Sequence, residues 1–100
     1  MLIKAKTSAG GFGSFVKVVV DINREVISAA CELHIDCADE LVGDGSKSSD
    51  LWGANVYTAD KRIDFVSLIN IRPDIGNKSM EILDAAIRAK VEAIIKKLLF

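Results

Sequence analysis

Four runs that alternate with the two-residue period of β-strands precede one run with helical spacing, and this order defines the expected fold. The runs at 15–22, 25–35, 51–58 and 62–71 are rich in β-branched and aromatic residues, which favour strands. Turn-forming residues at 23–24 and 59–61 separate the runs in pairs, so two antiparallel hairpins are expected. Pro73 ends the fourth run because proline cannot donate a hydrogen bond to a strand ladder. The pattern leaves open how the two hairpins pair with each other.

The C-terminal run predicts a helix of about 16–20 residues, because its apolar residues recur at intervals of three and four. These residues are Met80, Leu83, Ile87, Val91, Ile94 and Leu98. Charges of alternating sign, four residues apart, are typical of a solvated helix face, and here they belong to Asp84, Arg88, Glu92 and Lys96. The sequence therefore predicts an α+β fold, in which a four-stranded antiparallel sheet carries one long C-terminal helix on one face.

A single helix covers only one face of such a sheet. The opposite face then exposes Val26, Ala30, Val66 and Leu68, unless the N-terminal segment folds over it. Because an uncovered apolar face is unstable in water, we expect a homodimer that packs sheet to sheet or through a sheet edge.

Composition and charge are those of a small globular domain. The 100 residues allow one domain, half of them are hydrophobic and 27% are charged. The net charge of -1 provides no field that would attract nucleic acid. No apolar run reaches the roughly 20 residues of a membrane span or resembles a signal peptide. We expect a cytoplasmic protein, with a flexible Gly-rich N-terminus at 1–14 and a single domain at 15–100.

The two cysteines, Cys31 and Cys37, match neither a C-x-x-C redox pair nor a zinc site. Reduced thiols are therefore expected, with Cys31 buried as a small hydrophobic residue on the second strand. In the acidic connection at 36–50, one helical turn is expected at 38–42, followed by a stop at 43–46. This connection is the one that we expect to carry function.

Polar residues outside the hairpin turns gather in three runs, which the expected fold brings to one end of the sheet. The candidate ligand-binding residues are Glu32, His34, Asp36, Asp44, Ser46, Asp50, Trp52, Asn70, Arg72, Asn77 and Glu81. Glu32, His34 and Asp36 alternate onto one strand face, where they can hold a metal ion or keep an imidazole between carboxylates. The alternative is a structural histidine that forms a hydrogen bond. We assign no metal site and no cofactor.

Two other side chains in these runs have alternative roles. The Arg72 guanidinium is suited to a carboxylate or phosphate, but it can equally form an internal salt bridge with Glu32 or Asp36. Trp52 can be a stacking platform, although a tryptophan that enters a strand is typical of a core position. The residue types alone do not decide between these roles.

The three runs also carry a resemblance to a known family. They read ELHID at 32–36, DGSKSSDLWG at 44–53 and SLINIRPDIGNKSME at 67–81. Together they resemble a family of short uncharacterised prokaryotic proteins, a domain of unknown function, from residue 15 to the C-terminal helix. The resemblance implies one compact domain, and it assigns no role to any residue.

Two functions fit these residues. The first is a non-catalytic binding or assembly module, a homodimer whose polar sheet end binds a small anion or a peptide through Arg72, Asn77 and His34. The alternative is a metal-dependent or general-base hydrolase-like enzyme. In that enzyme His34 is the base or ligand, Glu32 and Asp36 are orienting carboxylates, and Arg72 is an electrostatic clamp. Neither nucleic acid nor a membrane is an expected partner.

Overall fold

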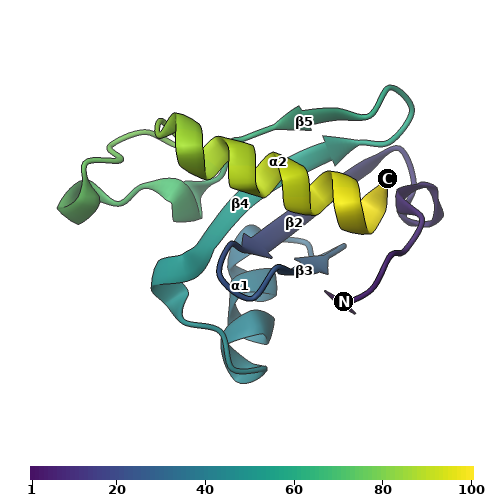
Figure 1. Cartoon of the computed structure of the whole chain (residues 1–100), viewed down its shortest axis with the longest axis horizontal. Helices are drawn as coiled ribbons and strands as arrows, with labels where there is room; N and C mark the ends of the chain where they lie inside the picture. The colour runs from purple at the N-terminus through teal and green to yellow at the C-terminus, as the bar shows by residue number, and fades with distance from the viewer.

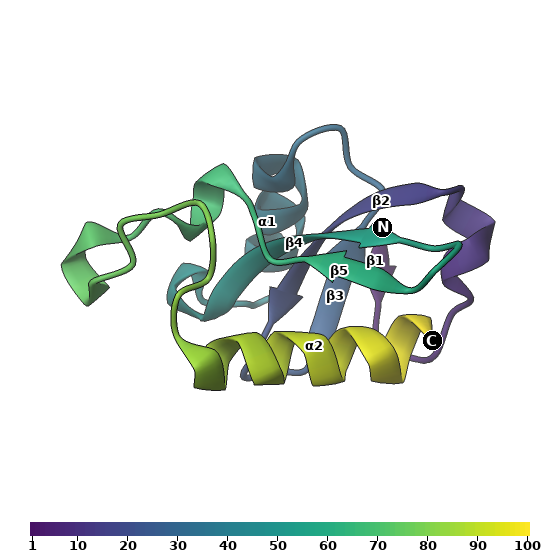
Figure 2. The same ribbon diagram turned by 90° about the horizontal axis from the view of Figure 1, so that it is seen from above.

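The computed structural model describes residues 1–100 and places a five-stranded antiparallel sheet between two helices (Figures 1 and 2). In chain order the elements are β1 (Leu2–Ile3), β2 (Phe15–Asp21), β3 (Val26–Ala29), α1 (His34–Gly43), β4 (Leu51–Tyr57), β5 (Arg62–Asp64) and α2 (Ala85–Leu99). Short 3-10 helices lie at Ala9–Phe12, Ser48–Asp50, Leu68–Asn70 and Pro73–Ile75. The strand order is β1-β3-β2-β4-β5.

Both predicted hairpins are present, although the fourth strand, predicted for 62–71, is wrong beyond Asp64, because Leu68–Asn70 form a 3-10 helix instead. The structure also shows how the hairpins pair. β2 pairs with β3, β4 pairs with β5, and β2 and β4 join the hairpins along their full lengths, from Phe15 opposite Tyr57 to Asp21 opposite Leu51. The β2–β3 turn is held by Asp21, whose Oδ1 accepts hydrogen bonds from the backbone N–H groups of Asn23 and Arg24. The two central strands are therefore β2 and β4.

The central strands are apolar on both faces, and each face packs against one helix. The larger core lies under α2, where Val18, Val20 and Trp52 of the sheet meet Val91 and Ile95 of the helix. The smaller core lies under α1 and contains Val19, Val26, Cys37, Ala38, Leu41 and Leu51. Figure 2 shows the two helices on opposite sides of the sheet.

The sheet has five strands rather than four, and there are two helices rather than one. β3 ends at Ala29, and Ala30 takes a left-handed backbone conformation with φ 64°, which turns the chain out of the sheet. The strand predicted for 25–35 is therefore wrong beyond Ala29. Residues 34–43 form α1, a full helix where one turn was expected, because a helix puts Cys37, Ala38 and Leu41 on one buried face.

α1 covers part of the sheet face that we expected to be open, so Val26 is buried there, whereas Ala30 and Leu68 are exposed as expected. A fully uncovered face is therefore wrong as the premise for a homodimer, and the homodimer itself stays a prediction. At the edge of the sheet, Leu2 and Ile3 pair with Ser28 and Ile27 to form the strand that sequence analysis did not identify. The Gly-rich segment that follows contains a 3-10 helix, in which Ala9 is buried against the larger core.

The predicted C-terminal helix is confirmed, but α2 begins at Ala85, later than the first residues of the predicted apolar stripe. Val91, Ile94 and Leu98 are buried, as the spacing predicts, whereas Met80 and Leu83 precede the helix and are exposed. Asp84 caps α2, since its Oδ1 accepts hydrogen bonds from two N–H groups of the first turn. Neither helix has the length and apolar composition that crossing a membrane requires.

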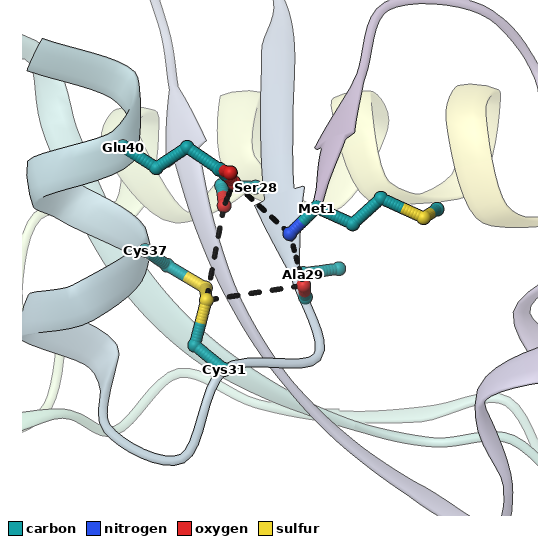
Figure 3. Close-up of polar contacts among 6 residues, drawn as sticks. All are labelled: Met1, Ser28, Ala29, Cys31, Cys37 and Glu40. Atoms are coloured by element: carbon teal, nitrogen blue, oxygen red, sulfur yellow. Dashed lines mark hydrogen bonds and ion pairs between the residues drawn. A yellow bond between two sulfur atoms is a disulfide. The ribbon is translucent and has the colours of Figure 1, made fainter. Parts of the chain in front are cut away.

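The cysteines form a disulfide, so the expectation of reduced thiols is wrong. Cys31 does not lie on a strand but in the turn before α1, and Cys37 lies in the helix. Their Cα atoms are 5.8 Å apart and their sulfur atoms 2.10 Å apart (Figure 3). A Cα separation of about 4.4–6.8 Å is the range that a disulfide spans. Helix α1 produces this proximity, which the strand interpretation did not allow.

Candidate functional site

The outer edge of β4 is only partly covered by a neighbouring strand. β5 pairs with residues 55–57 of β4, so the outer edge of residues 51–54 has no strand partner. Unpaired backbone groups at a sheet edge need other partners. The residues that connect β5 to α2, here called the 65–83 loop, provide them.

Asn70 replaces a strand partner with its side-chain amide. Its Oδ1 accepts a hydrogen bond from the Gly53 N–H at 2.8 Å, and its Nδ2 donates to the Gly53 carbonyl at 2.9 Å and to the Met80 carbonyl at 3.0 Å. The loop can approach this closely because residue 53 is glycine. A Cβ atom there would lie 2.5 Å from the Cβ of Ser67.

Arg72 covers the next part of the same edge. Nη1 donates to the Ser49 carbonyl at 3.0 Å and Nη2 donates to the Leu51 carbonyl, while the guanidinium lies 4.3 Å from the centre of the Trp52 ring. Burial lowers the pKa of Arg72, and the charges of two nearby aspartates oppose this shift. Arg72 forms no salt bridge with Glu32 or Asp36. Backbone carbonyls and an indole ring occupy the guanidinium instead.

Trp52 occupies the core position considered for it. Its side chain is only 2% exposed and belongs to the larger core, and its ring also stacks with the arginine. Asn77, which is buried, organises the 65–83 loop from within. Its Nδ2 donates to the carbonyls of Asn70, Ser79 and Glu81, and its Oδ1 accepts from the Leu83 N–H.

His34 links α1 to the sheet rather than standing on a strand. Its Nε2 lies 2.8 Å from the Ala54 carbonyl oxygen. Because a carbonyl can only accept, Nε2 carries the proton in this hydrogen bond. Burial lowers the pKa of His34, and the positive charge of Lys17 adds to this effect, while the hydrogen bond to the Ala54 carbonyl and the neighbouring Asn55 side chain oppose it. The imidazole therefore acts as a neutral donor.

This environment predicts that the protein loses stability as the pH falls through the titration of His34. In the unfolded chain histidine titrates near pH 6.5, whereas the folded pKa is lower, so between these values the unfolded state binds more protons. Acid therefore favours unfolding in this window. Urea unfolding at about pH 7.5 and about pH 5.5 should give a lower unfolding free energy at the acid end.

The His34→Gln variant is the control for this measurement. Glutamine can still donate to the Ala54 carbonyl but does not titrate, so its stability should depend less on pH in this window. Glu40 and Asp44, whose pKa values are also lowered, contribute only below about pH 4.5. An equal pH dependence in both proteins would contradict the assignment.

Glu32 and Asp36 do not join His34. The two carboxylates are exposed, and His34 and Asp36 lie in a helix, so the strand alternation that placed all three on one face is wrong. Nowhere in the chain do three or more His, Cys, Asp or Glu side chains gather in a way that could hold a metal ion.

Asp44 and Ser46 belong to a separate polar network at the far end of α1. Ser46 Oγ donates to Asp21 Oδ2 at 2.6 Å, and Arg24 contacts both Ser46 Oγ at 2.7 Å and Asp44 Oδ2 at 2.8 Å. Lys4 completes the network at 2.7 Å from Asp44. Hydrogen bonds from Lys4, which has the larger effect, and from Arg24 lower the pKa of Asp44. This network fixes α1 to the β2–β3 turn.

Asp50 and Glu81 contribute mainly through their backbones. The Asp50 carbonyl accepts from the Ile22 N–H, and Glu81 forms an isolated bridge with Val66 that closes part of the loop. The structure therefore brings Trp52, Asn70, Arg72 and Asn77 together at the β4 edge. It does not bring the other candidates into the same cluster.

A groove lies between α1 and the 65–83 loop, and we call it the α1 groove. It consists of two cavities of about 530 and 280 Å³ that share Ile35 and Ile69 as lining residues. Seven of the ten large apolar side chains that are exposed in this protein line it, namely Leu33, Ile35, Val42, Leu68, Ile71, Ile75 and Met80. Exposed apolar side chains that gather in this way mark an interaction site.

Two polar residues of the smaller cavity each have a side-chain group without a partner, and sequence analysis missed both residues. Lys17 and Asn55 lie opposite each other on β2 and β4. Lys17 forms no ion pair. The Asn55 Oδ1 atom is buried without a hydrogen-bond partner, while its Nδ2 donates weakly to the Val66 carbonyl at 3.4 Å. The available signal was a lysine between apolar residues of β2.

The fold and the groove define a small antiparallel α+β domain with an apolar groove beside a sheet edge that side chains cover. The chain belongs to the family described as protein of unknown function (DUF5674), whose model matches residues 3–98. No curated protein and no solved structure matches the chain. The resemblance to a domain of unknown function is confirmed, and a proposal about function has to rest on the groove.

Proposed function

We propose that this protein is a non-catalytic binding module, and that the α1 groove binds the C-terminal end of a partner protein whose last residue is apolar. The observation that carries the proposal is the pair formed by Lys17 and Asn55 in the smaller cavity. Lys17 offers a positive charge that forms no ion pair, and Asn55 Oδ1 is a buried acceptor without a donor.

A peptide C-terminus supplies what these two side chains lack. Its carboxylate can pair with the Lys17 ammonium, and its last amide N–H can donate to Asn55 Oδ1. Satisfying a buried acceptor removes a desolvation penalty, so this contact favours binding. The walls of the cavity, which include Leu33, Leu68 and Met80, then surround an apolar side chain.

The sizes of the two cavities fit this arrangement. The smaller one, of about 280 Å³, accommodates one terminal residue. The larger one, of about 530 Å³, has room for the residues that precede it, and it is lined by Ile71, Ile75 and Val42 together with Asp39 and Asp74. Mostly apolar pockets with a few polar groups are typical ligand sites.

The enzyme hypothesis receives less support from the same geometry. The His34 Nε2 is engaged by the Ala54 carbonyl, and the Arg72 guanidinium is engaged by two backbone carbonyls and Trp52. The exposed Glu32 and Asp36 have no contact with His34. A homodimer is a separate prediction, which native mass spectrometry tests.

The proposal is tested with two synthetic pentapeptides, Ser-Gly-Val-Ala-Leu with a free C-terminal carboxylate and the same peptide as an amide. Fluorescence anisotropy of N-terminally labelled peptides measures both affinities. We expect the acid to bind about tenfold more tightly than the amide, a difference equivalent to about 1.4 kcal/mol.

Variants identify where the peptide binds. Lys17→Gln should remove the preference for the acid, and Asn55→Ala should weaken both peptides, whereas Lys90→Gln on the opposite helix should change neither. Equal affinities for the acid and the amide, or no binding at millimolar protein, would contradict the proposal.

A further inference from the structure

We infer that the Cys31–Cys37 disulfide is a reversible thiol–disulfide exchange site, attacked at Cys31 by a dithiol. The two sulfur atoms differ in access, because Cys31 is partly exposed and Cys37 is completely buried. A separate cavity of about 280 Å³ reaches Cys31 and is lined by Phe12, Phe15, Val16, Lys17 and Ala30. An attacking sulfur therefore has a route to Cys31 and none to Cys37.

The dithiol supplies both electrons that reduction of the Cys31–Cys37 disulfide requires. A thiolate of the dithiol attacks the Cys31 sulfur, a mixed disulfide forms, and Cys37 leaves as a thiolate that takes up a proton. The second thiolate of the dithiol then attacks its own sulfur in the mixed disulfide and releases Cys31. Two electrons pass to the protein, which gains two thiols, and the dithiol becomes a disulfide. The positive charge of Lys17 in the same cavity favours the thiolate of Cys31.

The surroundings of Cys31 suit the reduced form as well as the oxidised one. The Cys31 sulfur lies 3.9 Å from both the Ser28 hydroxyl and the Ala29 carbonyl (Figure 3). Either oxygen can accept a hydrogen bond from a Cys31 thiol, because Ser28 already donates to Glu40 at 2.5 Å. Reduction therefore leaves no polar group without a partner at this point.

The rest of the fold does not depend on the disulfide. The bond joins residues only six positions apart, so it restricts the unfolded chain far less than a long-range bridge does. The helix α1 is also held by the buried Leu41 and by the network of Asp44 with Arg24. In a protein of the cytoplasm, where we expect this one, disulfides are typically transient.

The segment between the cysteines is where reduction acts. Among the backbone hydrogen bonds outside helices and strands, none involves Cys31 or Glu32. Leu33, His34 and Ile35, which line the α1 groove, lie in this segment. Reduction should therefore loosen one wall of the groove and lower the affinity of the groove for its peptide ligand. This consequence rests on the proposed function.

The first test follows the exchange alone. The full chain is equilibrated with mixtures of reduced and oxidised dithiothreitol, and free thiols are then alkylated and counted by mass spectrometry while circular dichroism reports the fold. We expect reversible appearance of two thiols with an unchanged far-ultraviolet spectrum. A disulfide that is reduced only in denaturant, or a reduced chain that unfolds, would overturn the inference.

Single variants test the site of attack. Cys31 in the Cys37→Ser variant should react with an aromatic disulfide reagent about tenfold or more faster than Cys37 in the Cys31→Ser variant, because accessibility controls the rate. Equal rates would contradict attack at Cys31.

The second test measures the coupling to the groove with the labelled carboxylate peptide. Its affinity for the reduced protein should be about threefold or more weaker, because the binding-competent conformation of the turn is then only partly populated. The Cys31→Ser/Cys37→Ser double variant should show the weaker affinity under all conditions. Equal affinity in both redox states would disprove the coupling. If the oxidised protein binds no peptide, the proposed function fails, and the alkylation results still decide the exchange.

Discussion

The Asn70→Ala variant should unfold with a free energy about 2–4 kcal/mol lower than that of the unmodified protein. The Asn70 side chain is 0% exposed and forms three hydrogen bonds with backbone groups of Gly53 and Met80. Alanine removes all three and leaves the N–H and carbonyl of Gly53 at an edge that no strand covers. Each buried group left without a partner costs about 1–3 kcal/mol.

Urea unfolding followed by far-ultraviolet circular dichroism measures this change. The matched control is Asn23→Ala in the exposed β2–β3 turn, which should change the stability by no more than about 0.5 kcal/mol. A loss below about 1 kcal/mol for Asn70→Ala would mean that the amide does not replace a strand partner. The 65–83 loop would then need another anchor.

Replacing Leu41 with alanine should cost about 2–5 kcal/mol, the usual range for a large apolar residue removed from a core. Leu41 is 0% exposed and lies at the centre of the smaller core under α1. That core contains only six buried residues, so few neighbours can move to fill the space. The variant should also weaken peptide binding, because α1 forms one wall of the groove.

Thermal unfolding and the anisotropy measurement together check this prediction. Val42→Ala is the control for stability, since Val42 lies next to Leu41 on the same helix but is 47% exposed. Its effect on unfolding should stay below about 1 kcal/mol. A Leu41→Ala protein as stable as this control would contradict the role of α1 as a packed cover of the sheet.

Local patterns predicted the hairpins and the C-terminal helix because their buried residues are set by strand or helix periodicity. The same reasoning failed at residues 65–71, where the fourth strand ends early, and at residues 30–35. Cys31, Leu33 and Ile35 continue the two-residue alternation of apolar side chains in the preceding strand. The pattern therefore predicted a longer strand there. The structure instead turns at Ala30 and forms α1, which covers an apolar sheet face. The apolar burial that favours α1 comes from contacts between residues distant in sequence, and a local pattern does not contain such contacts.

The candidate site was predicted in part for the same reason. Asn70, Arg72 and Trp52 were predicted as candidate ligand-binding residues, and the structure brings them together at the edge of β4. Their partners are backbone groups of that edge, which no residue pattern reveals. Lys17 and Asn55 were missed because their proximity depends on the pairing of β2 with β4, which the sequence left open.

The α1 groove as a peptide site is tested most directly by nuclear magnetic resonance of the isotope-labelled protein. The unlabelled carboxylate pentapeptide is added stepwise while the backbone amide signals are followed. The account predicts shifts concentrated at Lys17, Leu33, Ile35, Asn55 and Ile69, with the α2 face unchanged. Shifts centred on α2, or no shifts at a millimolar concentration of peptide, would contradict it.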